Sequence, residues 1–167
     1  MRRRKLIVVA SALVILVVAA AGVASAADND KQSNGQPFAL VGTWEVTLML
    51  PGAPPGSVLA TFNADGTTVE SAAAPPTTRG ASHGVWERTG NDLYSVTRVF
   101  FRFNPTTGAF LGTTNVNATV RVAQDRQTFA AVSISELRDP SGVLIVGGLH
   151  GSATAVRMEV EEIPDQP

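Results

Sequence analysis

The stretch SHGVWERTG, residues 82–90, holds one of the two histidines and one of the two tryptophans of the chain. His83 could act as a general base or donate a hydrogen bond to the head group of a ligand. Its ring could equally satisfy loop carbonyls at the end of a strand. In an extended strand His83 and Trp86 fall on opposite faces, so Trp86 is expected in the core or in one wall of a cavity.

The stretch LYSVTRVFFRF, residues 93–103, places Tyr94, Arg98, Phe100 and Arg102 on one face of a strand. If this face points inward, its two guanidinium groups line a cavity and can bind a carboxylate or an enolate. If it points outward, both arginines are surface charges whose aliphatic stems cover Phe100. Both interpretations stay open. The other face is more apolar and is predicted to be core: Leu93, Val99, Phe101 and Phe103.

Several chemistries are excluded by composition. The chain has no cysteine and only two histidines, which removes thiolate catalysis, cysteine-ligated zinc and a histidine-rich metal site. We therefore expect no cofactor and no metal. Removal of residues 1–26 takes away four of the 13 lysines and arginines and none of the 14 acidic residues, which leaves a net charge of about −5. A nucleic-acid partner is not expected, because no basic block remains.

The N-terminal residues 1–26 are typical of a secretory signal. Four basic residues precede an apolar run, and the small residues at 24–26 match a cleavage site. The alternative is an uncleaved anchor, because the apolar run of 18 residues could just cross a bilayer. Cleavage predicts a secreted or periplasmic protein without membrane insertion. Residues 27–37 then form a flexible leader, 38–162 the folded domain, and 163–167 a disordered tail.

Alternation of apolar and polar residues dominates the folded domain, as in TWEVTL, residues 43–48. This period is typical of antiparallel strands with one dry face and one wet face. Turn residues separate eight such runs, and an up-and-down meander of eight strands loses its exposed edges when it closes. We predict an all-β, eight-stranded antiparallel barrel, with a sandwich as the alternative. The strands are expected near 43–50, 57–63, 67–72, 83–88, 92–103, 109–123, 127–138 and 143–160.

The proline-rich segments 49–57 and 72–82 are predicted to be loops at one mouth of the barrel, which would be the portal. Small side chains are expected to line the interior and to leave volume for a ligand: Thr114, Ser133, Ser135, Ser152 and Thr154. The glycines of VGGLHG, residues 146–151, predict a bend or bulge in the last strand.

Gly42-x-Trp44 opens the first predicted strand after a short apolar lead from Phe38. This pattern resembles the signature that begins strand one in lipocalins and the wider calycin superfamily. The resemblance implies that Trp44 plugs the closed end of a barrel and that a basic residue of the last strand lies across it, which by order is Arg157. The Thr-Asp-Tyr element and the disulfide of many lipocalins are missing. In strand number and size the chain is also similar to allene-oxide-cyclase-like barrels.

These observations predict a secreted protein that holds a hydrophobic or amphipathic small molecule, which can be acidic, in the barrel cavity. The expected contacts to the ligand are His83, Trp86, Tyr94, Arg98, Phe100 and Arg102. The alternative is a cofactor-independent cyclase or isomerase that uses the same cavity, in which His83 or Tyr94 moves a proton and Arg98 steadies an oxyanion. A structural envelope domain with a filled core is a third possibility.

Overall fold

A computed structural model describes residues 38–162, and it contains eight strands and no helix in this range. The predicted signal, leader and tail lie outside these residues. No helix within 38–162 is long and apolar enough to span a bilayer. The strands are β1 (Gly42–Met49), β2 (Gly56–Phe62), β3 (Thr67–Ala72), β4 (Arg79–Gly90), β5 (Leu93–Phe103), β6 (Phe110–Val122), β7 (Thr128–Arg138) and β8 (Leu144–Arg157).

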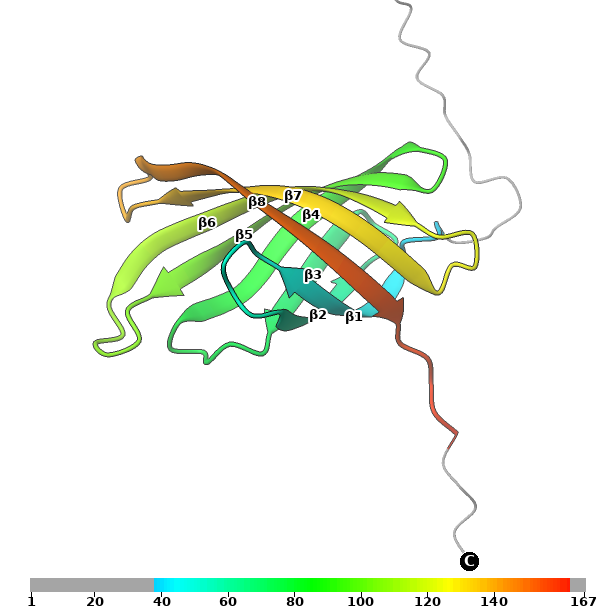
Figure 1. Cartoon of the computed structure of the whole chain (residues 1–167), viewed down its shortest axis with the longest axis horizontal. Coiled ribbons are helices and arrows are strands. Elements are labelled where there is room, and N and C mark those ends of the chain that lie inside the picture. The colour runs from blue at the N-terminus through cyan, green and yellow to red at the C-terminus, as the bar shows by residue number, and fades with distance from the viewer. Residues whose placement is uncertain (1–37, 163–167) are drawn as a thin grey trace, which may run out of the picture. The chain divides into compact units, whose positions relative to one another are not determined.

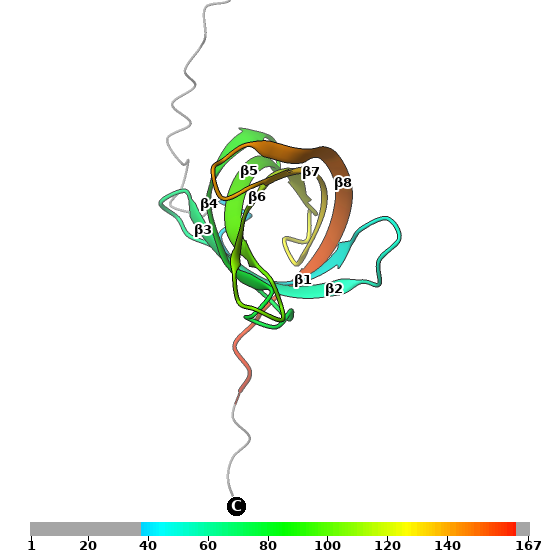
Figure 2. The same cartoon turned by 90° about the vertical axis from the view of Figure 1, so that its left-hand side faces the viewer.

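The strands form a closed antiparallel barrel in simple sequence order, so the predicted fold class is confirmed and the sandwich alternative is wrong. Figure 1 shows the strands crossing one another at a steep tilt, and Figure 2 shows them arranged as a ring. The ring closes where β1 pairs with β8, from Trp44 opposite Arg157 to Met49 opposite Ser152. Closure leaves no free sheet edge over this part of the barrel.

One end of the barrel, the closed end, is plugged by the residues of the lead-in. Leu40 and Trp44 are fully buried, and the Trp44 indole donates a hydrogen bond to the Leu40 carbonyl oxygen at 2.9 Å. The Arg157 guanidinium lies over the Trp44 ring, 4.2 Å from its centroid, and donates to the carbonyl oxygens of Ala39 and Val41. Gly42 has a φ of +133°, and a side chain there would collide with Arg157. The contact expected between Trp44 and Arg157 is therefore present.

The more apolar face of β5 lies on the outside of the barrel, the reverse of the orientation that its sequence predicts. Tyr94 and Val96 are buried in the barrel, whereas Val99 and Phe101 are 36% and 54% exposed on the outer surface. The prediction that the Phe101 face is the core is wrong. The face that carries Arg98 points inward instead, where Arg98 has the buried partner described below. On β8 the buried residues are Ala153 and Ala155, so Ser152 and Thr154 do not line the interior.

The opposite end, which we call the mouth, carries the loops 50–55, 73–78, 104–109 and 139–143. The predicted loop 72–82 is shorter than expected, because β4 already begins at Arg79. Strands β1 to β3 stop early, and the hairpins β5–β6 and β7–β8 project beyond them at the left of Figure 1. At the mouth the wall is therefore made of β4 to β8 only.

Strand β8 contains the predicted irregularity. Its pairing with β7 jumps from Leu149 opposite Ser135 to Val146 opposite Leu137. Gly147 and Gly148 lie opposite Glu136 alone, one residue more than in regular pairing, and Gly148 has a φ of +70°. This bulge bends β8 where it leaves the closed part of the barrel.

Candidate functional site

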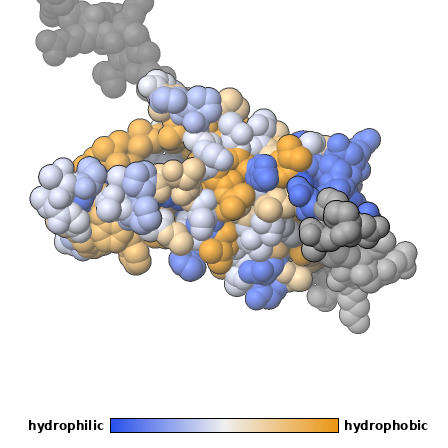
Figure 3. All heavy atoms as spheres, turned by 90° about the horizontal axis from the view of Figure 1, so that it is seen from below, coloured by the Kyte–Doolittle hydropathy of each residue, from blue (hydrophilic) through white to orange (hydrophobic). Residues whose placement is uncertain are grey.

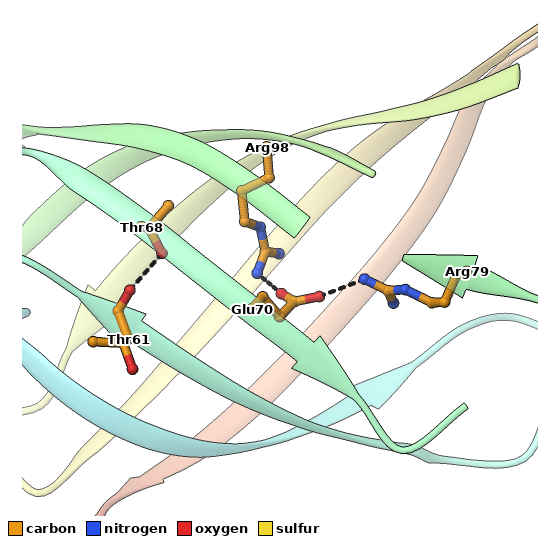
Figure 4. Close-up of polar contacts among 5 residues, drawn as sticks. All are labelled: Thr61, Thr68, Glu70, Arg79 and Arg98. Atoms are coloured by element: carbon orange, nitrogen blue, oxygen red, sulfur yellow. Dashed lines mark hydrogen bonds and ion pairs between the residues drawn. The ribbon is translucent and has the colours of Figure 1, made fainter. Parts of the chain in front are cut away.

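A buried cluster of three charged side chains lies inside the barrel between β3, β4 and β5 (Figure 4). The Glu70 carboxylate accepts a hydrogen bond from the Arg79 guanidinium at 2.9 Å and forms an ion pair with Arg98 through its other oxygen. The side chain of Glu70 is 4% exposed, that of Arg98 12% and that of Arg79 15%. Charged groups with so little exposure require paired partners, and Glu70 supplies one carboxylate to both arginines.

The strand register explains how these residues meet. Glu70 pairs with Ser82, Ser82 pairs with Phe100, and Gly84 pairs with Arg98. Side chains at directly paired positions project from the same face of the sheet. One row of inward positions therefore carries Glu70, Ser82 and Phe100, and the next row carries Arg98.

Gly84 allows β4 to pass close to β5 at this point. A Cβ atom on Gly84 would collide with the Thr97 carbonyl oxygen and would lie 2.9 Å from the Cα atom of Arg98. Gly84→Ala is expected to lower the free energy of unfolding by about 2–3 kcal/mol, because backbone must move to admit the methyl group. Chemical denaturation measures this loss. Gly80→Ala, on the same strand, is the control.

A Cβ on Gly80 would find its nearest neighbour, the Phe101 Cβ, at 3.9 Å, which is an ordinary contact. This variant should stay within about 0.5 kcal/mol of the parent protein. Equal losses in both variants would contradict the close approach at Gly84.

The cluster carries one net positive charge. Burial lowers the pKa of Arg98 to about 10, and it also lowers the pKa of Arg79. Since 10 is well above neutral pH, the Arg98 guanidinium stays charged there. Two cations and one carboxylate leave one positive charge in the cluster, which one further negative group would balance.

Four buried polar atoms in and beside the cluster have no hydrogen-bond partner among the described residues. They are the donors Arg79 Nε, Arg98 Nε and Ser82 Oγ and the acceptor Glu70 Oε2, which forms the ion pair with Arg98, and Ser82 is fully buried. The Arg79 guanidinium also lies 3.8 Å from the centroid of the Phe100 ring, which holds it in place. Buried donors of this kind are costly unless a further acceptor satisfies them.

The interior differs between the two halves of the barrel. The half next to Trp44 is packed, and its small cavity of about 20 Å³, bordered by Phe62, Phe129 and Arg98, holds no more than one water molecule. This half therefore has no room for the ligand that the sequence predicts. Towards the mouth the inward side chains are only partly covered, among them Ser135, Leu137 and Leu149. The charged cluster lies between the packed half and the open half.

Two larger hollows lie on the outer surface. One has a volume of about 690 Å³ and is lined by outward residues of β1, β7 and β8, such as Thr47, Ala130 and Thr154. The other has a volume of about 490 Å³ and is lined by residues such as Asn117, Ile134 and His150. In the described part of the chain, neither hollow contains a buried polar group without a partner.

The structure separates the residues that the sequence suggested for one site. His83 is exposed and pairs with Val69 and Val99, which also face outward. Trp86 and Tyr94 pack against each other near the closed end, with ring centroids 5.6 Å apart. Burial raises the pKa of Tyr94 above its ordinary value. Neither His83 nor Tyr94 is brought together with Arg98 in the cluster.

The indole of Trp86 is already satisfied by protein. Its Nε1 donates to the carbonyl oxygens of Asn63 and Thr67 at 3.1 and 3.2 Å. Arg102 is inward but committed to backbone, because its guanidinium donates to the carbonyl oxygens of Leu111 and Arg138. Of the six expected ligand contacts, Arg98 belongs to the cluster and Phe100 packs against its Arg79.

Sequence reasoning missed Glu70, Arg79 and Ser82. Within 38–162 no group of three or more histidine or acidic side chains is placed to hold a metal ion. Comparisons of the chain with protein families, with curated proteins and with solved structures find no match. The site therefore has to be interpreted from its own chemistry.

Proposed function

We propose that this protein binds a small amphipathic molecule with one negatively charged group. The apolar part of the ligand lies in the mouth half of the barrel, against side chains such as Leu137 and Leu149. Its anionic group reaches the cluster of Arg79, Arg98 and Ser82. The ligand then lies nearer the mouth than it would in a calycin-like barrel with a cavity along its whole length.

The observation that carries this proposal is the set of unpartnered donors on a cluster with one net positive charge. A carboxylate would accept hydrogen bonds from these donors and balance the charge at once. A neutral ligand satisfies fewer donors, and a cationic ligand is repelled. The charged cluster thus selects for a single negative charge, while the apolar side chains above it select for a hydrocarbon body.

Titration calorimetry with decanoate, decanol and decylamine tests the proposal, because the three ligands share a chain and differ in head group. Decanoate is expected to bind at least about tenfold more tightly than decanol, since charge-assisted hydrogen bonds contribute about 1.5–3 kcal/mol. Decylamine is expected not to bind. Arg79→Met should remove most of the preference for decanoate over decanol. Arg79 is chosen because it is the more exposed arginine of the cluster.

Arg121→Met is the matched control, because it removes the same charge from an exposed position on the outer surface of β6. It should bind decanoate as the parent protein does. Equal affinity for all three ligands would show that the cluster does not select the head group of the ligand. No binding of any of them would overturn the proposed function itself.

The cyclase or isomerase alternative receives no support from an observed arrangement. It assigns the proton transfer to His83 or Tyr94, and neither lies beside Arg98. The carboxylate that does, Glu70, is paired with two arginines. A structural role without a ligand would leave the three buried donors without acceptors.

A further inference from the structure

The first residues of β8 form a sheet edge that has no partner strand within 38–162. Strand β1 pairs with β8 only from Ser152 onward, whereas Leu144–Leu149 pairs with β7 alone. This segment, which we call the β8 edge, borders the side of the mouth where β1 to β3 have ended. One side of its backbone therefore keeps free N–H and C=O groups.

The β8 edge is also unusually apolar for an exposed edge. Leu144 is 49% exposed, Ile145 56% and Leu149 42%, and Val143 just before them is 62% exposed. Figure 3 shows hydrophobic surface over the left half and the middle of the barrel, next to the pale loops at the far left. Exposed edges are ordinarily protected by charged residues, proline or bulges. The segment 143–149 contains no charged residue and no proline, and bulges are its only protection of this kind.

The chemistry of the edge decides what kind of partner covers it. A lipid surface would cover the apolar side chains but would leave the backbone groups without hydrogen bonds, which is costly in an apolar medium. An extended strand satisfies both requirements. The segments on either side of the folded domain in the sequence do not meet both requirements, because residues 27–37 are mostly polar and 163–167 contain two prolines.

We infer that the β8 edge pairs with the same edge of a second copy of the chain. An antiparallel pair related by a two-fold axis brings apolar residues against apolar residues, with no charges to oppose each other. The walls of the two barrels then continue into each other. Two register shifts interrupt this edge, one at Gly147 and Gly148 and one at Ile145, so the pairing between the copies is confined to the short stretches beside them. This inference does not depend on the proposed ligand.

Single cysteine variants test the pairing directly, because the chain has no cysteine of its own and a disulfide must then join two copies. Leu144→Cys, Ile145→Cys and Val146→Cys are oxidised mildly and run on a non-reducing gel. Strong cross-linking is expected at the position nearest the two-fold axis, since Cα atoms across an antiparallel pair are about 4.5–5.5 Å apart. Val132→Cys, 64% exposed on the outer surface of β7, is the control and should not cross-link.

Analytical ultracentrifugation provides the second measurement. The parent protein is expected to form dimers in a concentration-dependent manner. Ile145→Lys should weaken dimerisation at least about tenfold, because it places two like charges near the axis, and Val132→Lys should leave it unchanged. A monomeric protein without cross-links, cross-linking at position 132 equal to that at 145, or a dimer that tolerates Ile145→Lys would overturn the inference. Binding of the monomer to phosphatidylcholine vesicles, lost in Ile145→Lys, would overturn it in favour of a lipid surface.

Discussion

Glu70→Gln is expected to destabilise the protein by about 3–5 kcal/mol, because it leaves two buried guanidinium groups without a countercharge. Glu70 is the only carboxylate within ion-pair distance of Arg98 among the described residues. Urea denaturation followed by far-ultraviolet circular dichroism measures the loss. The solvent-exposed Glu87 on β4 provides the control, and Glu87→Gln should change stability by less than about 0.5 kcal/mol.

A second variant separates the charge from the shape of the site. Glu70→Leu combined with Arg98→Met replaces a buried ion pair by apolar side chains of similar size, which is often neutral or stabilising. This double variant should therefore be more stable than Glu70→Gln alone. The buried cluster is refuted if Glu70→Gln unfolds at the same urea concentration as Glu87→Gln.

Trp44→Ala is expected to cost about 3–5 kcal/mol, the usual loss for a large buried aromatic side chain. The Trp44 indole packs against the Phe129 ring, with centroids 4.9 Å apart, and lies beneath the Arg157 guanidinium. Its removal opens a cavity where the lead-in meets the barrel. The midpoint of thermal or urea unfolding measures the effect.

Trp44→Phe divides this loss into two parts. The phenyl ring keeps an aromatic surface below Arg157 but leaves the Leu40 carbonyl oxygen without its donor, which should cost about 1–3 kcal/mol. Leu59→Ala, 49% exposed on the outer surface of β2, serves as the control and should have little effect. A Trp44→Ala variant as stable as Leu59→Ala would show that the closed end does not depend on this plug.

The architecture could be predicted from the sequence because turns and alternation are local signals. The segments between turn residues correspond to the observed strands to within a few residues, except at β4. There the prolines at 75 and 76 suggested a loop as far as Ser82, although the strand begins at Arg79. That difference hid Arg79 and Ser82 from the predicted interior.

The candidate site could not be predicted because its burial contradicts the hydrophobic pattern. In β3, Val69 is 39% exposed while Thr68 and Glu70 are buried. In β5, Phe101 is outside while Arg98 is inside. A charged residue becomes an interior residue only when its partner is also there, and that partner lies on another strand. Alternation showed that Arg98 and Phe100 share a face, but it could not show which side faces inward.

The location of the aromatic plug has a practical consequence for spectroscopy. Both tryptophans and the single tyrosine of the chain lie at the closed end, where Trp86 contacts Tyr94 and Trp44 contacts Phe129. Intrinsic fluorescence therefore reports whether this end is intact, and it should respond strongly to unfolding. A molecule at the opposite end of the barrel should leave the emission unchanged. An extrinsic label near the rim is the appropriate reporter of occupancy.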